Sequence, residues 1–221
     1  MNKGLKVEKD FWIEAWDKGM TGFHQSAPNK VLTTIGPKIF NKTKNVFVPL
    51  CGKSLDMLWL LENGHNVIGV EIAEKAVEDF FIENSLSFEI EKNEKFSIYR
   101  SKNIALYLGS FFDLTKEDLG KFDVYDRASI VALPKEMRQK YAQHLCNLSS
   151  GDTKILMQTY EQTQVPDVGP PFSILEDEIM NLFENHYSIE ILNRGDSVVP
   201  KRHQNAGATK TQFVVYHLAQ K

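Results

Sequence analysis

The stretch from Val46 to Glu71 reads VFVPLCGKSLDMLWLLENGHNVIGVE, and it is the part of the chain that decides the fold. An apolar segment leads into a turn at Gly52, an amphipathic segment (54–63) follows, and a second apolar segment (66–70) ends at Glu71. Strand, turn, helix and strand in this order predict a βαβ unit with a carboxylate at the end of its second strand. Ser54 is expected to cap the helix at its N-terminus, and Gly64 follows the helix.

The acid and the single glycine of this unit indicate the kind of ligand. A carboxylate at the position of Glu71 can accept hydrogen bonds from both hydroxyls of a ribose, although an acid there can also cap the next helix. Only Gly52 is present where a pyrophosphate-binding turn has two or three glycines. We therefore expect an adenosine cofactor without phosphates, and S-adenosylmethionine is the obvious candidate. A dehydrogenase that uses NAD is the alternative that the missing glycines disfavour.

Length and composition indicate one large α/β domain. The chain has 221 residues, of which 42% are hydrophobic, and this suffices for a full core without disulfides or a structural metal. We predict a single domain over residues 1–221, in which residues 1–42 precede the regular alternation of strands and helices. The two cysteines, Cys51 and Cys146, lack metal-ligand spacing, so no metal site is expected.

The overall charge makes some classes of partner improbable. With a net charge of −3 and an isoelectric point near 6.1, the chain lacks the basic excess of proteins that bind a phosphate backbone. No apolar run approaches the roughly 18 residues of a membrane span, and no signal peptide is evident. We therefore predict a cytoplasmic enzyme that binds small molecules, with no nucleic-acid or membrane partner, and a monomer by default.

Seven segments read as strands and alternate with helical patterns. The strands are expected at 46–48, 66–70, 104–108, 122–125, 155–159, 188–192 and 212–218. The helices are expected around 11–16, from Asn29 with an interruption at Gly36-Pro37, and at 54–63, 73–84, 135–148 and 174–185. Such alternation predicts a mostly parallel sheet with helices on both faces and an antiparallel edge formed by the last two strands. Residues 88–100 are charged and alternating, which predicts a peripheral hairpin.

Polar and aromatic residues follow several predicted strands. Ser110 and Phe111 follow the strand at 104–108 and could frame an adenine, or they could form an ordinary turn. Asp126 and Arg127 end the strand at 122–125. These two could be a local ion pair, but an arginine at this rim can also hold a carboxylate through a two-point fork. We favour the functional interpretation, in which Asp126 orients Arg127 and transfers no proton.

An aromatic cluster precedes the first strand. Trp12, Trp16 and Phe23 have the spacing of a core-facing helix stripe, but they lie ahead of the sheet and could cover a sulfonium cation. His24 could act as a base, although a lone histidine is more often structural. Cys51 has no histidine partner in its neighbourhood, so we interpret it as a small buried side chain.

These motifs together resemble the thiopurine S-methyltransferase family, especially its bacterial members. The resemblance rests on FWIEAWDKGMTGFHQ, VPLCGKSLDMLWL, GHNVIGVEI, GSFFDL, FDVYDRASIVAL and GPPF, which occur in this order from Phe11 to the C-terminus. It implies a class I S-adenosylmethionine-dependent methyltransferase fold: a Rossmann-like, mostly parallel seven-stranded sheet with an N-terminal helical cover over the active site.

The resemblance also implies roles for individual residues. The expected cofactor contacts are Trp12, Trp16, Leu50, Glu71, Ser110, Phe111 and Arg127. The expected acceptor contacts are Phe23, His24, Arg127 and Arg202, and the two arginines are the residues implied to act in catalysis. Where the family often has Trp-Asp-Arg-Gly, this chain has Tyr125-Asp126-Arg127-Ala128, so the departure falls on the acceptor side.

The implied reaction is methyl transfer from S-adenosylmethionine to the sulfur of a small aromatic or heterocyclic thiol such as a thiopurine, with S-adenosylhomocysteine as product. Arg127 and Arg202 would favour the thiolate, so no dedicated base is needed. Three alternatives remain open at this point: selenium or tellurium species or a halide as acceptor, a small metabolite thiol, and a regulator that binds the cofactor without catalysis.

Overall fold

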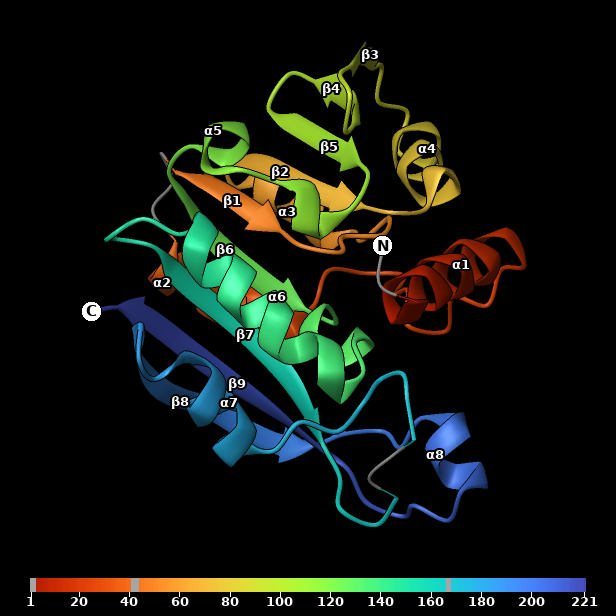
Figure 1. The fold of residues 1–221 in the computed structure, drawn as a ribbon, viewed down its shortest axis with the longest axis vertical. Coiled ribbons are helices and arrows are strands. Elements are labelled where there is room, and N and C mark those ends of the chain that lie inside the picture. The colour runs from red at the N-terminus through yellow and green to blue at the C-terminus, as the bar shows by residue number, and fades with distance from the viewer. Residues whose placement is uncertain (1–2, 41–43, 166–167) are drawn as a thin grey trace. The chain divides into compact units, whose positions relative to one another are not determined.

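The computed structural model describes residues 3–40, 44–165 and 168–221 (Figure 1). The chain forms two compact parts. The first part comprises Met1–Pro37 and Asn41–Leu114, and the second part comprises Lys38–Phe40 and Thr115–Lys221. The predicted cover over residues 1–42 is described from residue 3 to residue 40; residues 1–2 and 41–42 lie outside the described residues. No helix among the described residues is long and apolar enough to cross a membrane.

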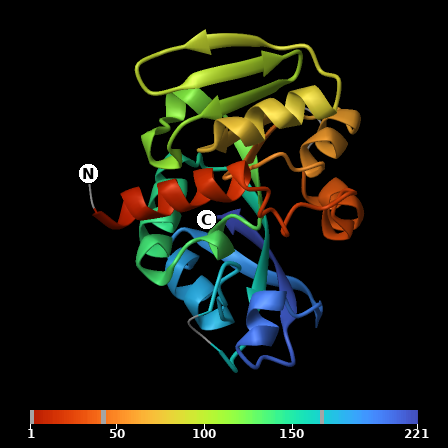
Figure 2. The ribbon, with the colours of Figure 1, turned by 90° about the vertical axis from the view of Figure 1, so that its right-hand side faces the viewer.

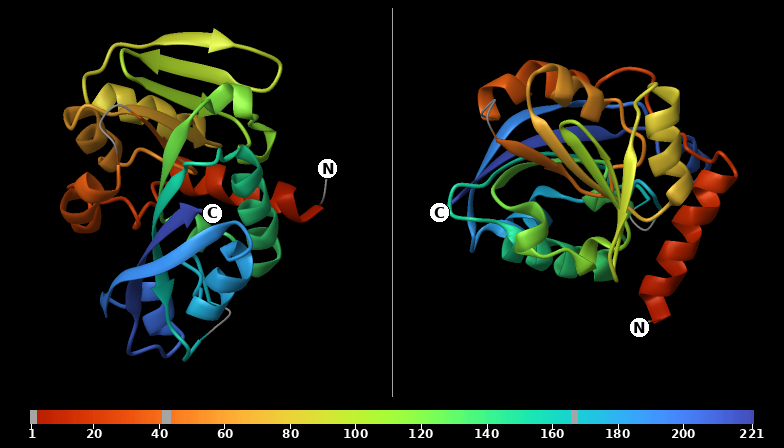
Figure 3. Two further views of the ribbon diagram at one scale, coloured as in Figure 1. Left: turned by 90° about the vertical axis from the view of Figure 1, so that its left-hand side faces the viewer. Right: turned by 90° about the horizontal axis from the view of Figure 1, so that it is seen from above.

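The first part contains a five-stranded arrangement in the order β3-β4-β5-β2-β1. Its strands are β1 (Asn45–Val48), β2 (Asn66–Glu71), β3 (Glu89–Lys92), β4 (Ser97–Ser101) and β5 (Ile104–Leu108). Strand β2 pairs in parallel with both β1 and β5, whereas β3 and β4 form an antiparallel hairpin beside β5 (Figure 3). The carboxyl ends of the parallel strands therefore lie at one edge of this arrangement, where β2 ends at Glu71.

Four α-helices begin in the first part: α1 (Lys3–Asp17), α2 (Lys30–Ile39), α3 (Asp56–Glu62) and α4 (Glu74–Glu83). The buried face of α4 consists of Ala76, Val77, Phe80 and Phe81, as its helical spacing predicts. Helix α1 lies beside α4 and packs against it (Figure 2). A short 3-10 helix, η1 (Phe111–Asp113), follows β5.

The described residues of the second part form four strands in the order β6-β7-β9-β8. They are β6 (Phe122–Arg127), β7 (Lys154–Glu161), β8 (Tyr187–Asp196) and β9 (Gln212–Gln220). Strands β6 and β7 are parallel, whereas β9 is antiparallel to both of its neighbours. The helices of this part are α5 (Lys116–Leu119), η2 (Ile130–Ala132), α6 (Lys135–Leu148), α7 (Glu176–Phe183) and α8 (Lys201–Asn205).

The structure confirms the α/β alternation and the antiparallel pair at the end of the chain. It corrects the strand number, because the described residues hold nine strands where the sequence predicted seven. The additional strands are the hairpin β3–β4, which the charged pattern placed at the periphery. Strand β3 is exposed, but Ile98 and Tyr99 of β4 are buried and β4 pairs with β5, so the hairpin extends the sheet.

Two local predictions about helices are also corrected. Helix α2 continues through Gly36-Pro37 to Ile39, because Leu32 and Ile39 are both buried and hold the helix on either side of the proline. The cap of α3 is Leu55 and not Ser54. The Ser54 hydroxyl instead accepts a hydrogen bond from the backbone N–H of Asp56, at 3.2 Å, and so forms the turn that leads into the helix.

Candidate functional site

Glu71 ends β2 with its carboxylate turned back onto the backbone of the βαβ unit. Its Oε2 accepts a hydrogen bond from the N–H of Gly52 at 2.9 Å. Its Oε1 accepts from the N–H groups of Ile72 at 2.7 Å and Ala73 at 2.9 Å. The side chain therefore joins the glycine turn after β1 to the residues that lead into α4.

Glu71 is a buried acid, and backbone hydrogen bonds offset part of the cost of burying its charge. The residue is 5% exposed. Burial raises the pKa of its carboxyl, and the hydrogen bonds from Ala73, Gly52 and Ile72 act in the opposite direction. A carboxylate offers about four lone-pair positions. Since the amides use three of them, one position remains on Oε2.

The glycine turn requires unusual backbone geometry. Gly52 has φ +51°, and Leu50 has φ +46°, which is rare for a residue with a side chain. Between them, Cys51 is buried, and both burial and the charge of Glu71 raise the pKa of its thiol. The thiol is therefore neutral and shielded, which fits the interpretation of Cys51 as a packing residue and not a nucleophile.

The predicted aromatic cluster forms on α1 and the segment after it. Phe23 makes edge-to-face contacts with Trp12, at 5.6 Å between ring centroids, and with Trp16, at 5.4 Å. Trp16 is 3% exposed and packs with Ala73 and Ala76 at the start of α4. Trp16 and Phe23 therefore pack against the start of α4, next to the Ala73 amide that binds the Glu71 carboxylate, and Trp12 packs on Phe23.

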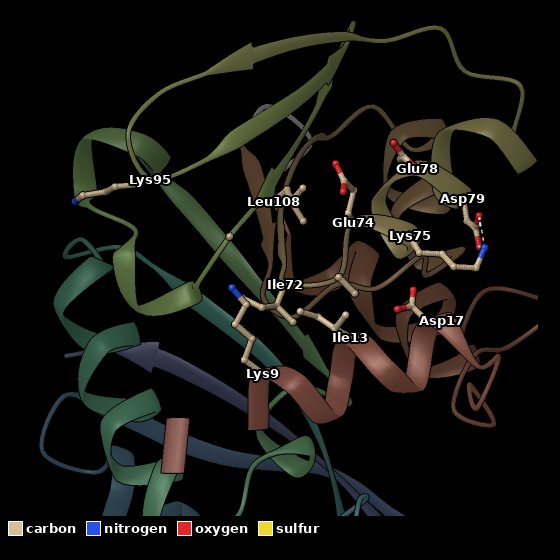
Figure 4. Close-up of a pocket in the computed structure, with 12 residues that line it drawn as sticks. Lys9, Ile13, Asp17, Ile72, Glu74, Lys75, Glu78, Asp79, Lys95 and Leu108 are labelled. Carbon is tan, nitrogen blue, oxygen red and sulfur yellow. Dashed lines mark hydrogen bonds and ion pairs between the residues drawn. The ribbon is translucent and has the colours of Figure 1, made fainter. Parts of the chain in front are cut away.

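A cavity of about 650 Å³ lies beside this segment (Figure 4). Ile72, Leu108 and Gly109 contribute its apolar wall, from the ends of β2 and β5. Lys9, Ile13 and Asp17 line it from α1, and Ala73, Glu74, Lys75, Glu78, Asp79 and Lys95 complete the lining. Its volume falls in the range of about 300–1,000 Å³ that small-molecule sites occupy.

The segment after β5 is more deeply packed than the sequence suggested. Phe111 is buried and its ring stacks on that of Phe47, with 6.3 Å between the centroids. The Ser110 hydroxyl accepts a hydrogen bond from the N–H of Phe112 and caps η1. Of this segment, Gly109 lines the cavity.

In the second part, Asp126 and Arg127 end β6 but do not form the ion pair considered from the sequence. Asp126 is fully buried, and its carboxylate accepts hydrogen bonds from the Tyr141 hydroxyl at 2.8 Å and from the N–H of Ile130 at 3.2 Å. Burial raises the pKa of Asp126 to about 6. Arg127 is half-buried, and the structure shows no hydrogen bond or ion pair between its guanidinium and any described residue.

Arg202 lies on α8 and is exposed. Its guanidinium donates a hydrogen bond to the carbonyl of Gly169, in the loop that follows β7. The neighbouring His203 is fully buried, and its Nε2 lies 2.9 Å from the carbonyl oxygen of Val168. Burial lowers the pKa of His203. Arg202 and His203 thus hold the loop at 168–169 together.

Most of the predicted cofactor residues gather in the first part. Its residues Trp12, Trp16, Leu50, Glu71, Ser110 and Phe111, with the acceptor candidates Phe23 and His24, belong to one compact unit, whereas Arg127 and Arg202 belong to the other. His24 is half-buried, and its backbone N–H donates to the carbonyl of Thr21. Among the described residues no group of three or more His, Cys, Asp or Glu side chains could hold a metal ion.

Sequence reasoning missed Ile72, Leu108 and Tyr141. Ile72 and Leu108 had a readable signal, because each stands at the carboxyl end of a parallel strand, where ligands bind in such sheets. Tyr141 is 15 residues from Asp126 and lies on a different element. Nothing in the local sequence predicts that pair.

Comparison with known proteins assigns the chain to a family. The model of the thiopurine S-methyltransferase family matches residues 7–221. The thiopurine S-methyltransferase of Pseudomonas fluorescens (strain Pf0-1) is 38% identical over 216 residues, which cover 96% of this chain and 99% of that protein. The corresponding protein of Teredinibacter turnerae is 41% identical over 189 residues, which cover 85% of this chain and 88% of that protein.

Solved structures that are distant in sequence share the fold. The Burkholderia thailandensis 1,6-didemethyltoxoflavin-N1-methyltransferase, crystallised with 1,6-didemethyltoxoflavin and S-adenosylhomocysteine, matches with a TM-score of 0.68 at 12% identity, covering 99% of this chain and 89% of that chain. A methyltransferase from Anabaena variabilis, described as S-adenosylmethionine-dependent, matches with a TM-score of 0.63 at 16% identity, covering 96% and 95%. At these identities the likeness concerns the fold alone.

Proposed function

The chain belongs to the thiopurine S-methyltransferase family, and we propose that it methylates the sulfur of a small aromatic or heterocyclic thiol, such as a thiopurine. Membership of this family makes it an S-adenosylmethionine-dependent methyltransferase. The structural observation that carries the proposal is the Glu71 carboxylate, fixed by three backbone amides at the carboxyl end of β2 beside a cavity of suitable size.

The residues of the first part fit an adenosine cofactor. Glu71 keeps one acceptor position on Oε2, which suits a ribose hydroxyl, and a second hydroxyl can bind where one of the three amides gives way. Ile72 and Leu108 provide apolar surface for an adenine ring in the adjoining cavity. No nest of glycine amides for a pyrophosphate accompanies Gly52, which favours a cofactor without phosphates.

When bound, S-adenosylmethionine supplies a methyl group on a positively charged sulfur, and a thiolate takes that methyl by in-line displacement while the sulfonium leaves as a neutral thioether. The chain's own residues orient the reactants and exclude water. Trp12, Trp16 and Phe23 supply an aromatic cover for the cofactor. His24 and Phe23 border the acceptor.

Arg127 and Arg202 act on the acceptor. A guanidinium near the acceptor sulfur lowers the pKa of the thiol, which is near 8.5 in free cysteine-like thiols, and so raises the thiolate fraction at neutral pH. Arg127 has no described partner that would compete for its fork, and it can also hold the carboxylate of the cofactor. Arg202 reaches an acceptor when its guanidinium leaves the Gly169 carbonyl. No general base is required.

The acceptor can be identified with a substrate panel. Initial rates of methyl transfer should be measured with thiopurines, other aromatic thiols, aliphatic thiols, selenite, tellurite and iodide, together with calorimetric binding of S-adenosylmethionine. We expect the highest kcat/KM for an aromatic or heterocyclic thiol. A higher kcat/KM for selenite, tellurite, iodide or an aliphatic thiol would contradict the aromatic thiol and identify that class as the acceptor. Cofactor binding without transfer to any of them would indicate a non-catalytic regulator.

We further propose that the protein works as a cytoplasmic monomer on small molecules, without a nucleic-acid or membrane partner. The net charge of −3 supports the absence of a nucleic-acid partner, because a phosphate surface would repel the protein. Light scattering after size-exclusion chromatography should give the mass of one 25.3 kDa chain. A mass of about twice this value would contradict the monomer.

A further inference from the structure

The turn that carries Arg127 is tied to helix α6 by a buried carboxylate. Asp126 places Oδ2 at 2.8 Å from the Tyr141 hydroxyl, which donates to it, and Oδ1 at 3.2 Å from the N–H of Ile130, which begins η2. Asp126 and Tyr141 are both fully buried. The side chain of Asp126 therefore spans the residues from Arg127 to Ser129 and closes them into a turn.

This turn has a backbone conformation that its sequence disfavours. Ala128 has φ +67°, in the left-handed region that residues with a Cβ rarely adopt. Such a conformation persists only where surrounding contacts enforce it, and it is common beside functional residues. In this turn Asp126 supplies such contacts, because its carboxylate binds the Tyr141 hydroxyl and the N–H of Ile130, which lies beyond the strained residue.

The charges around the pair favour this arrangement. Tyr141 stays protonated, because burial and the neighbouring carboxylate raise the pKa of its hydroxyl, so it remains a donor. Ser129 adds hydrogen bonds to the Asp126 carboxylate, and no charged side chain contributes to the pKa shift of Asp126. Arg138 of α6 and Glu178 of α7 are paired with each other at 2.8 Å. Hydrogen bonds to an ionised carboxylate are stronger than hydrogen bonds between neutral groups.

We propose that Asp126 and Tyr141 are positioning residues. They hold Ala128, in the Arg127–Ser129 turn, in its left-handed conformation and so fix the direction in which the Arg127 side chain leaves β6. The consequence for methyl transfer rests on the proposed function, in which Arg127 contacts the acceptor. Asp126, Tyr141 and the turn they hold all belong to the second part. Asp126 therefore acts on Arg127 through the backbone of the turn and not through an ion pair.

The alternative is that the Asp126–Tyr141 bond is only one buried hydrogen bond among others. Tyr187 is a matched control, because it is also a fully buried tyrosine of the second part whose hydroxyl donates to another side chain, Ser149 Oγ, at 2.7 Å. Tyr141→Phe and Tyr187→Phe each delete one hydroxyl and keep the ring. A general loss of stability would affect both variants alike.

The decisive variant is Ala128→Gly, because glycine adopts a left-handed φ without strain. Tyr141→Phe should lower kcat/KM for a thiopurine about fivefold in the natural background, as expected for a lost buried hydrogen bond. In the Ala128→Gly background the same substitution should change kcat/KM by less than about twofold. Tyr187→Phe should leave kcat/KM within about twofold of the natural protein in both backgrounds.

A second measurement does not depend on activity. The exchange rate of the Ile130 amide with deuterated solvent should rise about fivefold in Tyr141→Phe, and should stay unchanged in Tyr187→Phe. If the natural protein methylates no thiol, the proposed function fails, and the exchange data still decide the geometric claim. The positioning role is overturned if Tyr141→Phe has the same effect in both backgrounds, if Tyr187→Phe matches it, or if the exchange of Ile130 does not change.

Discussion

The indole ring of Trp16 lies directly against Gly52. A Cβ on Gly52 would come within 2.7 Å of Cζ2 of Trp16, a separation that real Cβ atoms do not show. The same glycine donates its N–H to Glu71. The tryptophan of α1 and the carboxylate of β2 thus depend on one position that tolerates no side chain.

A substitution at Gly52 separates this contact from backbone strain. Gly52→Ala combines an unfavourable left-handed φ, about 1–2 kcal/mol, with a clash against Trp16 that should cost about 1–3 kcal/mol more. Gly64→Ala is the matched control, because Gly64 has φ +83° but no atom within 4 Å of the place that a Cβ would take. Urea denaturation should show a larger loss for Gly52→Ala. Equal losses of unfolding free energy in the two variants would mean that α1 and Trp16 move aside for the new side chain at no cost in stability.

Removal of the Glu71 carboxylate should affect cofactor binding more than any other step of catalysis. Glu71→Gln keeps the size of the side chain but turns an acceptor into a partial donor facing three N–H groups. We expect the Kd for S-adenosylmethionine to rise about 10-fold or more in Glu71→Gln and Glu71→Ala, since hydrogen bonds to a charged group contribute about 1.5–3 kcal/mol. Calorimetry measures this directly, with the exposed Glu62→Ala as control. Unchanged affinity in Glu71→Ala would refute the ribose assignment.

Arg127→Ala should abolish most thiol methylation. Loss of a charge-assisted fork corresponds to about a 10- to 100-fold decrease in kcat/KM. Arg127→Lys keeps the charge but not the fork, so it should recover only part of the activity. Arg202→Ala should have a smaller effect than Arg127→Ala, because the Arg202 guanidinium is already bound to the Gly169 carbonyl. Steady-state kinetics with a thiopurine would contradict the assignment if Arg127→Ala kept its activity.

Asp126 should make the protein more stable as the pH falls from 7 to 5. Its pKa rises from the ordinary value of 3.8 to about 6 on folding, so the folded state binds a proton between these pH values and the unfolded state does not. The unfolding free energy should therefore gain about 1 kcal/mol over this interval, relative to Asp126→Asn. Denaturation of both proteins at pH 5, 6 and 7 tests the sign. A parallel pH dependence of the two would place the titration elsewhere.

The βαβ unit and the glycine turn could be predicted from the sequence because their signals are local. Apolar strands, Gly52 and Glu71 lie within 26 consecutive residues, and strand, helix and turn preferences operate over such distances. The charged pattern of residues 88–100 predicts the peripheral hairpin β3–β4, and β3 is exposed along its whole length at the edge of the sheet. Its pairing with β5 is a non-local contact, which propensity does not contain.

The sequence by itself determined the alternation of elements, the acid at the end of the second strand and the family motifs, because each depends on neighbouring residues and on their spacing. Tertiary structure alone decided how those residues are used. In the folded protein the Glu71 carboxylate binds three backbone amides and Trp16 packs against Gly52. Asp126 accepts a hydrogen bond from Tyr141 and forms no ion pair with Arg127. The physical reason is that a buried carboxylate must find donors wherever the fold supplies them, and those donors lie on other elements of the chain.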